Sequence, residues 1–329
     1  MRKILVALCA MATIVSCSKS EIFDIDREAI AFKNAFVLNG TRAADGFTIT
    51  TDKLLEFNVW ATTQRPGENQ PIVPILDEVK VSRTNASSDW GYDAANTQYW
   101  IPGNTYQFAA AKNYKSESVT LVNGVPSEFT YDAATQLDLL YAAVTRPGAN
   151  VTASGNTAVA FTFEHLLSKA YFTVDTNPMS GDNANYTYRV SNICINNAVK
   201  EATYTVADET WEGTANYTAQ NPLTFNNVNK NDKLIANKTY TSDLARLLVP
   251  ASYSALNITC TIETLYGDAV IDVQNYSKSI AQVFVKGYVY NFVLALSDPG
   301  EPIKFTVNPI PEWNTDINGN KEADDDISL

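Results

Sequence analysis

The chain has 329 residues, and its 36 acidic and 24 basic side chains give a net charge of −12 at pH 7. A surface this acidic repels phosphate backbones, which argues against nucleic acid as a partner. Only 18% of the residues are charged, whereas Thr, Asn, Ala, Tyr and Val abound, a composition typical of β-strands joined by polar turns. Because a single core stops growing at about 250–300 residues, we expect two domains.

The first 17 residues predict an export signal that ends in a lipid-anchored cysteine. Arg2 and Lys3 precede an apolar stretch at 4–15, and the small residues and cysteine of Ile14-Val15-Ser16-Cys17 follow. A spanning helix needs about 20 apolar residues, so the stretch is too short to remain in a bilayer and indicates a signal peptide. Its end is similar to a bacterial lipobox, in which the cysteine is acylated. Cys17 is therefore the predicted lipidation site, and the lipid is expected to hold the precursor on the cell outer membrane.

Residues 18–42 are predicted to form a separate unit around one strand. Ile30, Phe32, Phe36 and Leu38 fall on one face of an extended segment, and this period-two alternation predicts a strand with one buried face. A turn-rich stretch at 39–46 follows and contains Arg42. Exposed polar loops of this kind are where proteases cut.

From Phe47 onward, short alternating runs separated by turn signals predict β-sandwiches. The polar bridge at 148–155 is the expected boundary, which gives domains at 43–154 and 155–308 and an acidic tail at 309–329. A short helix at 135–143 is the only helical candidate.

One short motif occurs in both halves. Gly103-x-x-Tyr106-x-Phe108 recurs as Gly287-x-x-Tyr290-x-Phe292. We interpret it as a glycine that opens a turn, followed by two aromatic side chains on the same strand face. The repetition supports two related halves.

Residues suited to catalysis are scarce. His165 is the only histidine, and its apolar surroundings favour a packed or capping role over catalysis. Cys260 is in strand phase with Ile258 and Ile262 and is expected in the core; a disulfide with Cys194 is permitted by export but is not the favoured interpretation. No phosphate-binding loop or dinucleotide motif is present, so we expect no enzymatic activity and no cofactor.

The acidic tail contains the one metal-like pattern. Oxygen-bearing side chains are spaced nearly as in an EF-hand loop, although the first is not Asp, the last is not Glu and no flanking helix is evident. We interpret the tail as solvated, with calcium binding as the alternative, through Asn314, Asp316, Asn318 and Asp325.

Taken in order, these features resemble the Bacteroidales fimbrillin family, whose members build type V pili. After the lipobox cysteine and the apolar strand, the matching stretches are Thr41-Arg42-Ala43, Trp90-Gly-Tyr, Tyr99-Trp100-Ile-Pro-Gly-x-x-Tyr106-x-Phe108-x-Ala110, Asp138-Leu-Leu-Tyr-Ala142, Phe163-x-His165-x-Leu-x-Lys169, Gly287-x-x-Tyr-x-Phe, and Ile303-x-Phe305-x-Val307 followed by Trp313.

The resemblance implies two tandem β-sandwich domains of transthyretin-like Greek-key topology. It also implies export as a lipoprotein, cleavage after an arginine by a surface protease, and filling of the vacated groove by a strand of another pilin subunit. In this sequence Arg42–Ala43 is the implied scissile bond and 18–42 the released segment. The expected final location is the fimbrium, with a role in cell adhesion.

The C-terminus departs from a shaft subunit, which should offer an apolar alternating strand to its neighbour. Pro309 and Pro311 interrupt the end of the chain and polar residues follow, which favours a tip or accessory subunit.

Two other classes of protein remain as alternatives. A surface glycan-binding lipoprotein of a polysaccharide-uptake system would present two or more tryptophans on one exposed face. A secreted glycosidase would need two carboxylates lining a cleft. Most of the tryptophans are expected in packing roles: Trp60, Trp90, Trp100, Trp211 and Trp313.

Overall fold

The computed structural model describes residues 28–38, 49–154, 156–178, 185–225, 228, 233–242 and 245–310. These residues form β-strands arranged in four sheets, which confirms the all-β prediction. The helices among them are single 3₁₀ turns at Ala94–Asn96, Ser116–Ser118, Ala133–Thr135 and Gly148–Asn150. None of the helices in this part of the chain is long and apolar enough to span a membrane.

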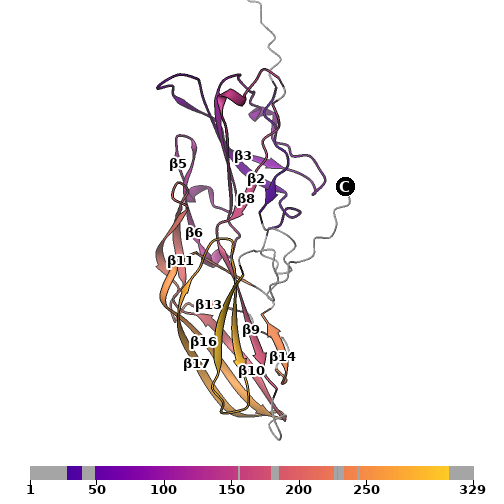
Figure 1. Ribbon diagram of the computed structural model, residues 1–329, viewed down its shortest axis with the longest axis vertical. Helices are drawn as coiled ribbons and strands as arrows, with labels where there is room; N and C mark the ends of the chain where they lie inside the picture. Colours follow the sequence, from indigo (N-terminus) through magenta and orange to yellow (C-terminus); the bar gives the residue numbers. More distant parts are fainter. Residues whose placement is uncertain are drawn as a thin grey trace, which may run out of the picture.

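The first sheet has six strands in the order β1-β8-β7-β4-β2-β3 and lies in the upper half of Figure 1. Alternating apolar residues such as Phe57 and Val59 point into one core, together with Tyr106 and Phe108 of a neighbouring strand. Irregular segments around Trp100 and 151–161 cover that face. The strands are β1 (Phe36–Val37), β8 (Thr162–His165), β7 (Leu140–Arg146), β4 (Thr105–Lys112), β2 (Glu56–Gln64) and β3 (Ile72–Ser82).

A four-stranded sheet joins the two halves of the chain, and Figure 1 shows its β6 and β11 between the upper and lower parts, with β5 beside the upper part. Trp60, from the opposite face of the first sheet, and Phe129 both pack against Tyr114, with ring centroids 5.4 and 6.1 Å apart. Strand pairing crosses the boundary expected at 154–155 twice. In this sheet β11 pairs with β6, and in the first sheet β8 pairs with β7. The strands are β12 (Thr210–Asn216), β11 (Val199–Thr205), β6 (Val125–Asp132) and β5 (Val119–Val122).

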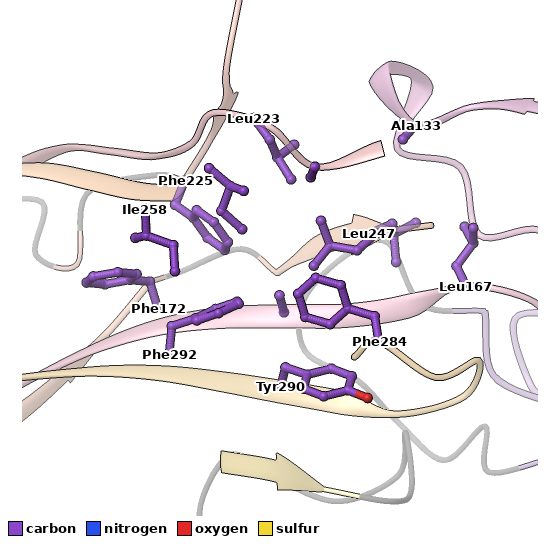
Figure 2. Packing of buried hydrophobic residues seen from close by; sticks show 14 of the residues in the cluster. Ala133, Leu167, Phe172, Leu223, Phe225, Leu247, Ile258, Phe284, Tyr290 and Phe292 are labelled. Carbon is purple, nitrogen blue, oxygen red and sulfur yellow. The ribbon is translucent and has the colours of Figure 1, made fainter. Parts of the chain in front are cut away.

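The lower half consists of two sheets with a shared core. Figure 2 shows Phe172, Phe225 and Phe292 gathered in this core; Phe225 lies 6.1 Å from Phe172 and 6.4 Å from Phe292 between ring centroids. One sheet has the order β13-β10-β16-β17: Leu223–Thr224, Tyr186–Ile195, Ser252–Tyr266 and Ala269–Val283. The other has the order β14-β9-β18-β19: Lys238–Thr241, Ser168–Thr176, Val289–Leu296 and Lys304–Ile310, with β15 (Arg246–Leu248) also paired to β9.

The repeated glycine–tyrosine–phenylalanine motif forms the same local structure in both halves. Gly103 and Gly287 have φ angles of 80° and 74°, a region that favours glycine. Three residues later, the hydroxyl of Tyr106 accepts the backbone N–H of Ile101 at 2.7 Å. The hydroxyl of Tyr290 likewise accepts a backbone N–H, from Val285, at 2.9 Å. The turn and the common buried face predicted from the motif are confirmed.

One other expectation is corrected. The candidate helix at 135–143 is wrong: the 3₁₀ turn ends at Thr135, Gln136 takes a left-handed φ of 51°, and β7 begins at Leu140.

Cys194 and Cys260 are free thiols. Cys260 is buried, as predicted, and burial raises the pKa of its thiol to about 12. Cys194 is only partly buried and lies opposite Thr259, the strand neighbour of Cys260. Because successive strand residues face opposite sides, the two thiols lie on opposite faces of the sheet.

Candidate functional site: an N-terminal strand at a sheet edge

The predicted modification sites lie outside the described residues. These are Cys17, Arg42, Ala43 and the tail positions Asn314, Asp316, Asn318 and Asp325. The described part does contain residues 28–38, which we call the N-terminal segment; its regular strand is β1 alone, and isolated bridges lie at Ala29 and Phe32. The next described residue is Ile49. The site is therefore built from this segment and from the residues that hold it.

The second half of the N-terminal segment runs parallel to residues 159–163 at the edge of the first sheet. Three of its backbone N–H groups donate to carbonyls of that stretch: Lys33 to Val159 at 3.0 Å, Phe36 to Phe161 at 2.9 Å and Leu38 to Phe163 at 2.7 Å. In addition, the N–H of Val37 donates to the hydroxyl of Thr51 at 3.1 Å.

The first half of the segment has partners on both sides. Ile30 N–H donates to the carbonyl of Gln98 at 2.8 Å, and Trp100 N–H donates to the carbonyl of Glu28 at 3.0 Å. On the other side, Val159 N–H donates to the carbonyl of Ala31 at 2.8 Å. The segment therefore fills a slot between two stretches of backbone, so its removal would leave hydrogen-bonding groups unpaired on both.

The predicted buried face of the segment is wrong in its second half. Ile30 and Phe32 are buried, as expected, but Phe36 and Leu38 are 53% and 48% exposed, and their neighbours Ala35 and Val37 are buried instead. The cause is Asn34, whose φ of 52° is left-handed. Three residues from Lys33 to Phe36 span two residues from Val159 to Phe161, so the strand contains a bulge that shifts its phase by one residue.

Phe32 is the main apolar anchor of the segment. Its ring packs against Tyr92, Phe161 and Phe108, with centroid distances of 5.5, 5.9 and 6.4 Å. The hydroxyl of Tyr92 donates to the carbonyl of Ile30 at 2.6 Å. Aromatic pairs of this kind add about 0.5–1.5 kcal/mol beyond the burial of area.

At Ile49 the chain is held by a buried polar pair. Ile49 N–H donates to Oδ2 of Asp138 at 2.9 Å, and Oδ1 of Asp138 lies 2.9 Å from Nδ1 of His165. The Asp138 and His165 side chains are 0% and 1% exposed, so no substrate reaches them. The expected packed role of His165 is thus confirmed, and the carboxylate of Asp138 joins the start of the downstream chain to β8.

Among the described residues, neither the tryptophans nor the acidic side chains form a second candidate site. Of the described tryptophans, Trp60 and Trp100 are buried, while Trp90 and Trp211 are half-buried. Trp90 packs on Phe57 and carries the guanidinium of Arg83 over its ring, and Trp211 packs on Tyr204. None of the described tryptophans is fully exposed. Within the described residues, no group of three or more His, Cys, Asp or Glu side chains is placed to hold a metal ion.

Solved structures of other proteins share this fold. A fimbrial protein from Bacteroides vulgatus has 16% identity and a TM-score of 0.56, over 78% of this chain and 92% of that one. A candidate cell adhesion protein from Bacteroides ovatus has 13% identity and a TM-score of 0.52, over 86% and 97%. No curated protein sequence matches the chain. The model of the fimbrillin-like family matches residues 41–313. The chain therefore belongs to the fimbrillin-like family.

Proposed function

We propose that this chain is a fimbrial subunit that matures by losing the N-terminal segment and then accepts a strand of another subunit in its place. The observation that carries the proposal is the pairing of 33–38 with 159–163 at the edge of the first sheet. An edge strand can leave without splitting a sheet, and the vacated edge offers an incoming strand both backbone partners and an apolar floor. The family match begins at residue 41, after the segment, which supports the same division.

Release of the segment requires a cut between Leu38 and Ile49, and we propose Arg42–Ala43 as the bond, cut by an arginine-specific surface protease. Arg27 precedes the segment and Arg65 precedes a proline, so a cut at either would not free it cleanly. The downstream chain stays attached after the cut, because Ile49 remains bonded to Asp138.

Loss of the segment has a direct energetic consequence. Its withdrawal uncovers the apolar contacts of Ile30, Phe32 and Val37, each worth roughly 1.5–3 kcal/mol of burial. The cleaved subunit is therefore expected to be less stable until another strand fills the slot. Because an incoming strand would restore the lost stability, the cleaved subunit favours assembly over the isolated state.

The proposed place of this subunit is at the tip or in an accessory position, in a fimbrium that serves cell adhesion. Its precursor is anchored through a lipid on Cys17. The last described strand, β19, is paired to β18 within its own sheet, with Pro309 opposite Tyr290. The sequence that follows is polar and acidic. This arrangement supports a subunit that accepts a strand and donates none.

The maturation step is tested by purifying the protein from the cell surface and sequencing its N-terminus. Mature protein that begins at Ala43 in fibre fractions supports the proposal, and Arg42→Ala should leave an uncleaved monomer. Arg65→Ala is the matched control and should mature normally. Mature-sized protein from the Arg42→Ala variant would reject the site.

The acceptor slot is tested with a synthetic peptide that covers residues 28–38, added to the cleaved subunit. The peptide should raise the melting temperature. Peptides that carry Phe32→Asp and Phe36→Asp form a matched pair, since Phe32 is buried and Phe36 is exposed. The first should fail to bind and the second should bind like the parent. Equal binding of both would show that the slot is not the acceptor.

A further inference from the structure

Strand β17 is the last strand of its sheet, and no described strand pairs with its outer edge. It spans 15 residues, and its partner among the described residues is β16 alone. Its side chains are exposed on both faces except for three that are partly covered, Tyr276, Ile280 and Gln282. Figure 1 shows it along the outer edge of the lower half. An edge of this kind presents a row of backbone N–H and C=O groups to which another strand can pair.

The strand lacks the usual protections of an edge. Natural edge strands are kept from pairing by short length, proline, bulges or several charges. β17 contains no proline, and its shifts of register against β16 lie toward its ends, so that the stretch from Asp272 to Ile280 is regular. Apolar side chains are exposed along it, at Val270, Ile271 and Val273, with exposed fractions of 45–55%.

The only two charges of β17 are placed symmetrically about Asn275, one residue from the centre of the strand. Asp272 and Lys278 each lie three residues from Asn275, and neither forms an ion pair with another described residue. When a second β17 lies antiparallel with Asn275 opposite its own counterpart, each Asp272 faces the Lys278 of the other copy. Opposed residues in this register share a face of the joined sheet, so both ion pairs form at once.

We propose that β17 is a self-association edge that joins two copies of this chain in that antiparallel register. The contact is isologous, because the same strand serves both copies and a two-fold axis passes at Asn275. Parallel pairing in register would instead oppose Asp272 with Asp272, which is unfavourable. The contact is independent of the slot for the N-terminal segment, because the two features lie in different sheets.

Charge reversal tests the register. The experiment uses the full chain with the substitution Arg42→Ala, so that the N-terminal segment stays in place and strand exchange does not contribute. Self-association is measured by sedimentation equilibrium. Asp272→Lys and Lys278→Asp should each weaken dimerisation about tenfold, because both ion pairs become repulsive. The double reversal should restore it. A parent that stays monomeric, or a double reversal that stays as weak as the single ones, would overturn the proposal.

Cross-linking gives an independent measurement. In the proposed register a cysteine at Asn275→Cys faces itself in the second copy, whereas a cysteine at Ser279→Cys faces Ile271. Both variants contain the same other cysteines, so a difference between them reports the new position alone. Mild oxidation should give a disulfide-linked dimer with Asn275→Cys and no more dimer than the parent with Ser279→Cys. Equal cross-linking of the two variants would contradict the register.

Discussion

The side-chain amide of Gln136 pairs with both backbone polar groups of Leu247. Its Nε2 donates to the carbonyl of Leu247 at 3.0 Å, and its Oε1 accepts the N–H of Leu247 at 2.9 Å. Gln136 belongs to the loop before β7, and Leu247 to β15 in the lower half. One side chain thus acts as a strand partner between segments 111 residues apart.

Removing this amide should weaken the attachment of the loop to β15. Gln136→Ala loses both hydrogen bonds to Leu247 and the one from Nε2 to the carbonyl of Ala133, and is expected to lower the free energy of unfolding by about 1–3 kcal/mol. Gln136→Gly loses the same bonds but suits the left-handed φ of 51°, so it should be about 1 kcal/mol more stable than the alanine variant. Urea unfolding of the three proteins measures both differences. An alanine variant as stable as the parent would contradict the assigned role of the amide.

The bulge at Asn34 predicts opposite outcomes at two phenylalanines that simple alternation places on one face. In the uncleaved chain, Phe32→Ala should cost about 3–5 kcal/mol, because it removes a buried ring from an aromatic cluster. Phe36→Ala should change stability by no more than about 0.5 kcal/mol. Denaturant unfolding of the two variants separates the outcomes, and a large loss at Phe36 would mean that the strand has no phase shift.

The hydroxyls of Tyr106 and Tyr290 each accept a backbone N–H, and we call these two contacts the tyrosine corners. They should contribute separately to stability. Tyr106→Phe and Tyr290→Phe each leave a backbone N–H without its acceptor, at an expected cost of about 1–2 kcal/mol. The corners belong to different cores and share no partner, so the double variant should show the sum. Tyr240→Phe is the matched control, because it removes the same kind of bond, to Ile235 N–H, at an exposed position. It should cost less than either corner in thermal unfolding.

Acid should remove the contribution of Glu56. Its carboxylate binds Lys112 and Lys80, and these contacts lower its pKa from 4.5 to about 2. A lowered carboxylate pKa contributes stability that is fully present above the ordinary value and is lost as the pH falls through the folded value. The difference in stability between the parent and Glu56→Gln should therefore be constant above pH 4.5 and shrink toward pH 2. In a Lys112→Met background, the loss of stability caused by Glu56→Gln at pH 7 should be smaller. If the difference in stability between the parent and Glu56→Gln does not change with pH, the ion pairs of Glu56 do not cause it.

Local patterns in the sequence were sufficient for the β-class, for the glycine turn and shared aromatic face of the repeated motif, and for the buried positions of Cys260 and His165. They were insufficient where one residue changes the phase of a strand, as Asn34 does, because alternation alone does not reveal a left-handed backbone. They also missed the pairing of β6 with β11, which brings together segments about 70 residues apart in the sequence. Such pairing depends on the assembled core and leaves no period in either strand.

Under the proposed strand exchange, the bulge at Asn34 defines the pattern that a replacement strand must have. The buried positions of the N-terminal segment, Ile30, Phe32, Ala35 and Val37, are separated by two, three and two residues. A donor that fills the same slot needs apolar side chains with this spacing and, between the second and third, a residue that tolerates a left-handed backbone, such as Asn or Gly. Partner subunits can therefore be sought in genomes by this spacing of apolar residues, which strictly alternating strands do not match.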